Sequence, residues 1–266
     1  FQSSLQLWIF GNAGKANTMS GVAISTWPTF KSRLAGSWRV ADQTMAFRFD
    51  RPLGWTFKAG QLVDITLLSP SETDAEGNVR GFSLASSPDE ETLLVTTRMR
   101  DTAFKRILEA ALPETEVKIE GPFGDFRLHL DITRPAVMFA GGIGVTPFRS
   151  MVLDAAHRKL KHRIFLFYFN RRPEDAPFLD ELQHLETGNP YYQFIGIMTQ
   201  RERSHRGWGG ETGHLNDAML KRYLKGVNNP IYYIAGPAPM VRGVREILNG
   251  AGIDDDDIHT EEFAGY

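Results

Sequence analysis

The segment Met-Phe-Ala-Gly-Gly-Ile-Gly-Val-Thr-Pro-Phe-Arg-Ser-Met, from Met138 to Met151, decides the fold of the second half of this chain. Its apolar start predicts the end of a buried strand, and its three glycines let the backbone turn tightly and approach a ligand. The threonine and proline that follow predict the N-cap and first position of a helix, whose free N–H groups favour a phosphate. The turn residues to which we assign this role are Gly141, Gly142, Gly144, Thr146 and Pro147.

The spacing of this turn is Gly-Gly-x-Gly-x-x-Pro, which differs from the Gly-x-Gly-x-x-Gly of the standard dinucleotide fingerprint. No acidic residue stands at the usual distance downstream. Taken alone, the turn fits either a nucleotide site or an ordinary connection between a strand and a helix.

Around the turn, apolar strand-like runs alternate with helix-length segments, which predicts a Rossmann-like α/β domain with a parallel sheet covered on both faces. In such sheets ligands bind at the carboxyl ends of the strands, so four loops are expected to meet at one edge. The expected strands are 136–140, 163–170, 192–199 and 231–235, with a possible edge strand at Glu262-Phe263, and the expected helices are 147–160, 176–185, 215–224 and 240–249.

The first half of the chain carries short alternating runs separated by turn residues, which predict a closed antiparallel β-barrel or a sandwich. The expected strands are 38–49, 61–68, 81–86, 93–99, 116–120 and 126–130, with a helix at 102–111 and a surface loop at 69–79. We therefore predict a β-barrel domain over 19–131 and an α/β domain over 132–266.

Composition narrows the possible functions. The 266 residues are 42% hydrophobic with a net charge of −2, which favours a globular protein and argues against bulk nucleic-acid binding. Cysteine is absent, which excludes disulfides and cysteine-ligated metal centres, and the histidines show no metal-ligand spacing. No apolar run is long enough to span a membrane. We interpret residues 1–18 as an expression-tag remnant before a native start at Met19.

Arg80-Gly81-Phe82-Ser83 resembles the Arg-x-Tyr-Ser motif of the ferredoxin–NADP reductase superfamily. Further motifs follow in the family order over residues 22–266. These are Thr96-Thr97-Arg98, the segment from Asp101 to Arg106, Gly121-Pro122-Phe123-Gly124, the glycine turn and Ala235-Gly236-Pro237. The resemblance implies a barrel that binds FAD and an α/β domain that binds NADPH or NADH.

The resemblance also implies individual FAD contacts. Arg80 would pair with the FAD phosphate, Phe82 would stack on the flavin without the hydroxyl of the usual tyrosine, and Ser83 would hydrogen-bond near flavin N5. An arginine and a helix N-terminus also suit a phosphate on chemical grounds. The implied FAD-binding residues are Arg80, Gly81, Phe82, Ser83, Thr96, Thr97, Arg98, Thr102 and Ala103.

On the nicotinamide side, the glycine turn resembles the family's nucleotide loop, and Thr146 would lie near both pyrophosphate and nicotinamide. The other implied contacts are Asn170, Arg171, Thr199, Gly236 and Pro237. Ala235 replaces a cysteine that many relatives carry. Arg171, Arg172, Arg201 and Arg203 follow strand ends where they could bind a 2′-phosphate, which favours NADPH over NADH without deciding it.

The chain end resembles one bacterial branch in which the terminus reaches back to the flavin. Phe263 and Tyr266 are then expected at the cofactor, and Glu261 or Glu262 could deliver a proton. The catalytic set that we predict is Ser83, Glu262 and Tyr266. The alternative is a frayed terminus. The acidic run from Asp254 to Asp257 is either a solvated loop or a docking site for a basic redox partner.

These observations predict a cytoplasmic FAD-dependent NAD(P)H oxidoreductase that transfers hydride from nicotinamide C4 to flavin N5. The electrons would pass to a separate acceptor such as ferredoxin or flavodoxin, with no nucleic-acid partner and no bound metal. Two alternatives remain open. One is a ferric-chelate, siderophore or quinone reductase of the same fold, and the other is a regulatory subunit that binds a nucleotide without catalysis.

Overall fold

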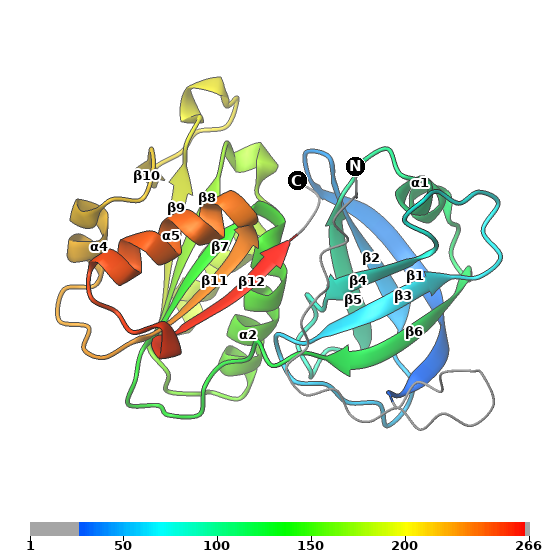
Figure 1. Ribbon diagram of the computed structural model, residues 1–266, viewed down its shortest axis with the longest axis horizontal. Coiled ribbons are helices and arrows are strands. Elements are labelled where there is room, and N and C mark those ends of the chain that lie inside the picture. The colour runs from blue at the N-terminus through cyan, green and yellow to red at the C-terminus, as the bar shows by residue number, and fades with distance from the viewer. Residues whose placement is uncertain (1–26, 264–266) are drawn as a thin grey trace, which may run out of the picture.

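The fold comes from a computed structural model that describes residues 27–263. It contains a six-stranded antiparallel sheet and a six-stranded parallel sheet, which lie side by side (Figure 1). This arrangement confirms the predicted fold class. The predictions for residues 1–18, Met19 and Tyr266 lie outside the described residues.

The antiparallel sheet curls into a barrel with the strand order β4-β3-β6-β1-β2-β5 (Figure 1). Its strands are β1 (Thr29–Ala41), β2 (Thr44–Asp50), β3 (Leu62–Leu67), β4 (Val79–Ser83), β5 (Thr92–Arg98) and β6 (Glu116–Phe123). Ala85 follows β4, and its N–H donates to the carbonyl of Leu94 in β5 at 2.8 Å, which joins the two edges of the sheet. Buried alternate residues such as Phe47 and Ile65 fill the interior.

Two predicted strands of the barrel differ in the structure. The run 38–49 is a hairpin rather than one strand, because β1 and β2 meet at a tight turn in which Gln43 has φ +53°. That turn lacks the Asn-Gly or Asp-Gly signal that marks most tight hairpins. The predicted strand 126–130 has no partner strand, and its Phe126 ring packs instead against Phe148 and Tyr233 of the α/β domain.

The parallel sheet has the strand order β10-β9-β8-β7-β11-β12. Its strands are β7 (Ala136–Gly141), β8 (Ile164–Asn170), β9 (Tyr192–Met198), β10 (Glu211–Thr212), β11 (Ile231–Pro237) and β12 (Ile258–Phe263). All six residues of the central strand β7 are buried, as expected for a strand covered on both faces. The sequence pattern did not reveal β10, which is only two residues long, and it showed only the end of β12.

Helices cover both faces of this sheet and one helix lies on the barrel. The helices are α1 (Ala103–Ala110), α2 (Val145–His157), α3 (Leu179–Gly188), α4 (Asp217–Tyr223) and α5 (Ala238–Gly250). The apolar residues of α2 and α3 pack on one face of the sheet, and those of α4 and α5 pack on the other. Among the described residues no helix is both long and apolar enough to cross a bilayer.

Candidate functional site

The glycine turn lies between β7 and α2 at the carboxyl edge of the parallel sheet. A Cβ at Gly144 would lie 2.3 Å from the backbone oxygen of Ala235, a contact that real side chains do not make. Gly142 has φ +52°, a conformation that glycine adopts without strain. The turn therefore needs glycine both for its backbone conformation and for its close approach to β11.

Thr146 and Pro147 do not have the predicted roles at the helix start. The helix begins two residues before the predicted first position, at Val145, with Gly144 as its N-cap. Thr146 is 1% exposed, and its hydroxyl donates to the carbonyl of Ile143 at 3.1 Å. This hydroxyl closes the short turn before the helix instead of capping it, while Pro147 occupies a first-turn position that needs no hydrogen-bond donor.

The carboxyl ends of four parallel strands meet around a cavity of about 470 Å³. The predicted residues that line it are Gly141, Gly142, Asn170, Arg171, Thr199 and Pro237. Gly236 lies beside them, because a Cβ built there would be 3.1 Å from the backbone of Gly141. The barrel contributes Thr44 and Arg98, so the cavity spans both domains.

Arg98 and Arg80 were both expected near the FAD phosphate, and the structure gives their side chains different neighbours. Arg98 lines the cavity of the α/β domain, whereas Arg80 lies over the ring of Phe104 in α1. The cause is the direction of β5, which ends at Arg98 and delivers this side chain to the domain junction. The structure thus places Arg98 with the predicted nicotinamide-side residues.

Two kinds of polar group lie at this cavity. One is an amide without a hydrogen-bond partner, and the other is a cluster of charged side chains. The side-chain amide nitrogen of Asn170 is buried and has no hydrogen-bond partner. Arg171 and Arg172 both pair with the carboxylate of Asp175, at 3.4 and 2.9 Å. The two arginines therefore share one carboxylate within the chain, while the buried amide of Asn170 lacks an acceptor.

Ser83 meets a carboxyl group of the other domain at the end of β4. Its hydroxyl donates to Oε1 of Glu261 in β12 at 3.1 Å, and Ser83 is 5% exposed. Burial raises the pKa of Glu261 to about 7, while the Ser83 hydrogen bond acts in the opposite direction. The second carboxylate oxygen is buried without a partner. Such a group can take up and release a proton near neutral pH.

The neighbours of Glu261 at the chain end have other positions. Glu262, which we predicted as the catalytic carboxylate, is exposed because successive strand residues point to opposite faces. The register of β12 places Glu261 opposite Ala235 and therefore beside the glycine turn. Phe263 packs against the core of the α/β domain. The contact with Ser83 thus belongs to Glu261 rather than Glu262.

Arg80 and Phe82 are occupied by partners of their own chain. The Arg80 guanidinium donates to the backbone oxygens of Glu76, Gly77 and Val79 and to the Glu76 carboxylate at 2.7 Å. Phe82 is 9% exposed and packs at 6.0 Å from the ring of Phe104. The predicted stacking face of Phe82 therefore belongs to the barrel core.

The N-terminus of α1 binds a carboxylate from the loop before β4. Asp74 accepts a hydrogen bond from the N–H of Ala103 at 2.8 Å, and its other oxygen lies 3.6 Å from Arg80. Thr102 caps the helix by accepting from the N–H of Lys105. Burial, together with Arg100 and Arg80, lowers the pKa of Lys105 to about 8. This region therefore holds several cations together with the carboxylates that pair with them.

The remaining predicted FAD contacts lie on β4 and β5. Thr96 and Thr97 are buried, and the hydroxyl of Thr96 has no hydrogen-bond partner. Gly81 is exposed on β4, and a Cβ there would lie 3.2 Å from the carboxylate of Asp64. The buried hydroxyl of Thr96 is a second group that lacks a partner within the chain.

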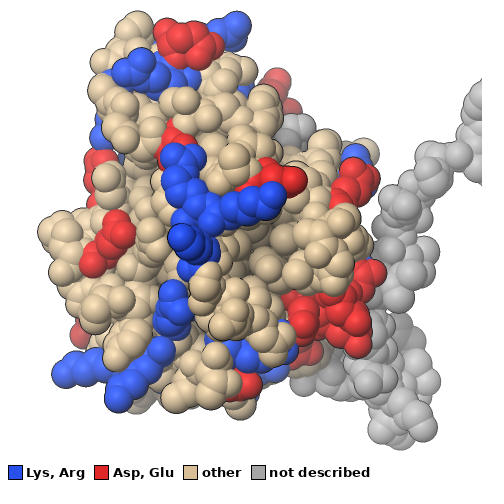
Figure 2. Space-filling view, turned by 90° about the vertical axis from the view of Figure 1, so that its left-hand side faces the viewer, with Lys and Arg blue, Asp and Glu red and all other residues tan. Residues whose placement is uncertain are grey.

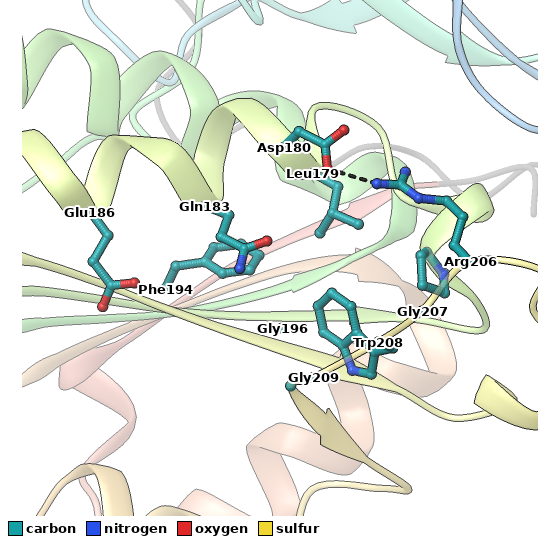
Figure 3. A pocket seen from close by; sticks show the side chains of 12 residues that line it. Leu179, Asp180, Gln183, Glu186, Phe194, Gly196, Arg206, Gly207, Trp208 and Gly209 are labelled. Atoms are coloured by element: carbon teal, nitrogen blue, oxygen red, sulfur yellow. Dashed lines mark hydrogen bonds and ion pairs between the residues drawn. The ribbon is translucent and has the colours of Figure 1, made fainter.

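A second cavity, of about 360 Å³, lies between α3 and the segment around Trp208 (Figure 3). It contains none of the predicted site residues, and an ion pair between Arg206 and Asp180 closes one side of it. Cβ atoms at Gly196 or Gly210 would lie 2.5 Å from the Trp208 ring. The two glycines thus provide the space that this ring occupies.

The face of the α/β domain that lies away from the barrel carries several lysine and arginine side chains (Figure 2). Arg201 and Arg203, which we predicted as possible 2′-phosphate ligands, are exposed. His162 is 4% exposed, and its ring packs against the ring of His129. No group of metal-ligating side chains occurs within residues 27–263.

The sequence patterns did not single out three residues that lie near the predicted site. Asp74 belongs to a segment that we expected to be a surface loop, Lys105 was only part of a motif, and Arg149 had no assigned role. A carboxylate shortly before the Arg80 motif was the only available signal for Asp74. The structure brings all three to positions beside the predicted site.

The chain is similar to several known oxidoreductases. A family described as the oxidoreductase NAD-binding domain matches residues 138–246. The glycine betaine monooxygenase reductase subunit of Chromohalobacter salexigens is 29% identical over 233 residues, 85% of this chain and 61% of the relative. A component of the Na⁺-translocating NADH-quinone reductase of Methylococcus capsulatus is 28% identical over 206 residues, 70% and 49% respectively. The chain therefore spans only part of these relatives.

Solved structures share the fold. A cytochrome P450 reductase, GcoB, from Amycolatopsis superposes with a TM-score of 0.74 at 20% identity, covering 92% of this chain and 73% of that one. A ferredoxin NADP⁺ reductase from Neisseria gonorrhoeae with bound FAD and NADP superposes with a TM-score of 0.69 at 19% identity, covering 88% and 98%. Both likenesses extend over the barrel and the α/β domain.

Proposed function

We propose that the chain is an FAD-dependent oxidoreductase of NADPH or NADH, of the ferredoxin–NADP reductase type. The observation that carries the proposal is the junction of the two domains. There the Ser83–Glu261 pair lies beside the glycine turn, because Glu261 pairs with Ala235 and Ala235 contacts Gly144. When bound, FAD would accept a hydride from the nicotinamide and pass electrons to an acceptor.

The barrel residues fit the phosphate of a flavin nucleotide. Arg80, Lys105 and the N–H of Ala103 would hold it, since a guanidinium, an ammonium and a helix N-terminus all favour anions. Two observations support this assignment. The pKa of Lys105 is lowered to about 8, in a cluster that an anion would stabilise, and the Asp74 carboxylate already binds Ala103 there. When the phosphate binds, the Asp74 carboxylate must either share the N–H of Ala103 with it or move away.

Glu261 and Ser83 would handle the proton in the proposed reaction. The Glu261 carboxyl exchanges its proton near neutral pH because burial raises its pKa to about 7. Ser83 connects this carboxyl to the barrel through a 3.1 Å hydrogen bond. Glu261 therefore holds or releases a proton at Oε1 or Oε2, and Ser83 orients the group.

The cavity at the glycine turn would bind the nicotinamide nucleotide. The unpartnered amide of Asn170 offers a donor, and Arg98 reaches the same cavity from the barrel. We propose NADPH as the preferred donor because the exposed Arg201 and Arg203 follow the end of β9, where they could bind a 2′-phosphate. Arg171 and Arg172 are poorer candidates because both pair with Asp175.

The acceptor is a separate protein or small molecule in this proposal, such as a ferredoxin, a flavodoxin or an oxygenase component. Two relatives support this proposal, since they are named as a monooxygenase reductase subunit and a quinone reductase subunit. Ferric chelates and quinones are further acceptors to assay. We also place the protein in the cytoplasm, where NADPH is regenerated.

A second candidate function is a regulatory subunit that binds a nucleotide without flavin. The observation in its favour is that Arg80 and Phe82 already have partners within the chain. An absorbance spectrum of the purified protein, recorded after incubation with FAD and desalting, distinguishes the two functions. A reductase retains the flavin bands and loses them when NADPH is added without oxygen. A protein that stays colourless contradicts the reductase.

A further inference from the structure

Arg149 is a buried arginine that connects three elements across the domain junction. It lies in the first half of α2 and is 6% exposed. Its guanidinium forms a fork with the carboxylate of Glu181 in α3, at 2.8 and 2.7 Å. On the barrel side it donates to the carbonyl of Ala85 at 2.5 Å and to the carboxylate of Glu90 at 3.2 Å. The ring of Phe178 lies 4.9 Å from its Cζ.

The next residue adds a second bond between the same segments. The hydroxyl of Ser150 donates to the carbonyl of Ser86 at 2.6 Å, and both residues are buried. Ala85 and Ser86 directly follow the Arg80–Ser83 motif, while α2 directly follows the glycine turn. The contact therefore connects the segment next to Ser83 with the helix that carries the glycine turn.

We propose that Arg149 is a positioning residue that sets the alignment between the glycine turn of the α/β domain and Ser83 of the barrel. This inference rests on the proposed function, because the alignment matters for a reaction in which one domain holds the donor and the other holds the acceptor. Arg149 touches neither cofactor in this scheme and acts only through the placement of the two domains.

Arginine suits this role because its planar guanidinium can bind a carboxylate through two parallel bonds and still donate to other groups. The desolvated charge is compensated by Glu181 and Glu90. Removing the cation leaves carboxylates and a carbonyl without their donor, which loosens the contact between domains. Lysine keeps the charge but cannot reproduce the fork.

A misalignment of the reacting groups by about 1 Å can slow a reaction about 100-fold. We therefore expect Arg149→Gln to lower the rate constant of flavin reduction at saturating NADPH by about 10-fold to 100-fold, measured by stopped-flow absorbance. The dissociation constants for NADPH and the FAD content should stay within about 3-fold of the unsubstituted protein, because Arg149 contacts neither. Arg149→Lys should recover part of the rate, and Ser150→Ala should produce a smaller loss.

The matched control is Arg51→Lys. Arg51 donates to the carbonyls of Trp55, Pro88 and Glu90, all within the barrel. It supports the same β4–β5 connection without crossing to the other domain. This variant should lower the stability of the barrel while leaving the rate constant of flavin reduction unchanged.

A second readout does not depend on activity. Because the chain has no cysteine, the exposed Glu109 and Glu246 can be replaced by cysteines and spin-labelled, one in each domain. The distance distribution between the labels should broaden or shift in Arg149→Gln and stay unchanged in Arg51→Lys. An unchanged distribution and an unchanged rate constant in Arg149→Gln would overturn the inference. A loss of NADPH affinity without a loss of rate would do the same. If the protein with Arg149 intact shows no flavin reduction at all, the proposed function fails first.

Discussion

At the scale of single residues, the decisive group is Glu261. Glu262 is the next residue along the strand, yet the carboxyl of Glu261 is buried against Ser83 whereas that of Glu262 is exposed. The pKa of about 7 arises from burial in a strand whose partner, β11, is itself buried. A one-residue shift of β12 would exchange the positions of these two side chains. The register of this edge strand therefore determines which carboxyl meets Ser83.

Glu261→Gln should change the pH dependence of stability. The folded state holds a proton on Glu261 up to about pH 7, whereas the unfolded state releases it near 4.5. The free energy of unfolding should therefore fall between about pH 4.5 and 7, by about 3 kcal/mol. Urea unfolding of the FAD-free protein at pH 5 and pH 8 measures this difference, which the glutamine variant should largely lose. Equal pH dependence in both proteins would show that Glu261 titrates normally.

Gly144→Ala should disable the glycine turn, because the new methyl group would lie 2.3 Å from the Ala235 backbone oxygen. We expect a loss of stability of about 1–3 kcal/mol and at least a tenfold loss of NADPH affinity, measured by fluorescence titration. Gly243→Ala is the matched control. It lies in α5 with nothing within 4 Å of its Cβ, so it should stabilise the helix by about 0.5–1 kcal/mol.

At the scale of elements, the loop from residue 69 to residue 78 and the helix α1 act as a pair. This segment is a surface loop, as expected, and it also carries three carboxylates that bind neighbouring elements. Glu72 pairs with Arg106 and Asp74 binds the N–H of Ala103, both in α1, whereas Glu76 pairs with Arg80 in β4. The loop therefore brings negative charge to the start of α1.

Asp74→Asn should tighten FAD binding if the carboxylate competes with the flavin phosphate. A carboxylate near a helix N-terminus contributes about 1 kcal/mol, which corresponds to about a fivefold change in the dissociation constant. Titration of the apoprotein with FAD, followed by flavin fluorescence, measures this change. Glu72→Gln, in the same loop but bonded to Arg106, should leave the affinity unchanged. Weaker binding by Asp74→Asn would mean that the carboxylate supports the cofactor.

At the scale of the whole molecule, two of the polar contacts between the barrel and the α/β domain differ in their exposure to water. The first is formed by the buried side chains of Arg149 and Ser150 with the segment that follows β4. The second lies at the β1–β2 turn, where the N–H of Asp42 donates to the carbonyl of Glu174 and its carboxylate pairs with Arg172 at 3.0 Å. The Asp42 side chain is 55% exposed, so water screens this second ion pair.

Asp42→Asn should therefore have a small effect. Exposed ion pairs contribute about 0–1 kcal/mol, and the backbone hydrogen bond to Glu174 is unaffected by the substitution. Thermal unfolding should show a change of that size at most, and the distance between labels at Glu109 and Glu246 should not move. A large shift in that distance would assign domain alignment to this surface contact instead of Arg149.

The sequence by itself determined the two sheets, the glycine turn and the meeting of four strand ends, because these depend on local periodicity and on glycine conformations. Only the tertiary structure decided which side chains meet between distant segments. It placed Arg98 at the cavity beside the glycine turn, Asp74 at the start of α1, and Glu261 rather than Glu262 against Ser83. The physical reason is that such pairs join residues about 29 to 178 positions apart. Their meeting depends on strand register and on how one domain sits against the other, which no local pattern records.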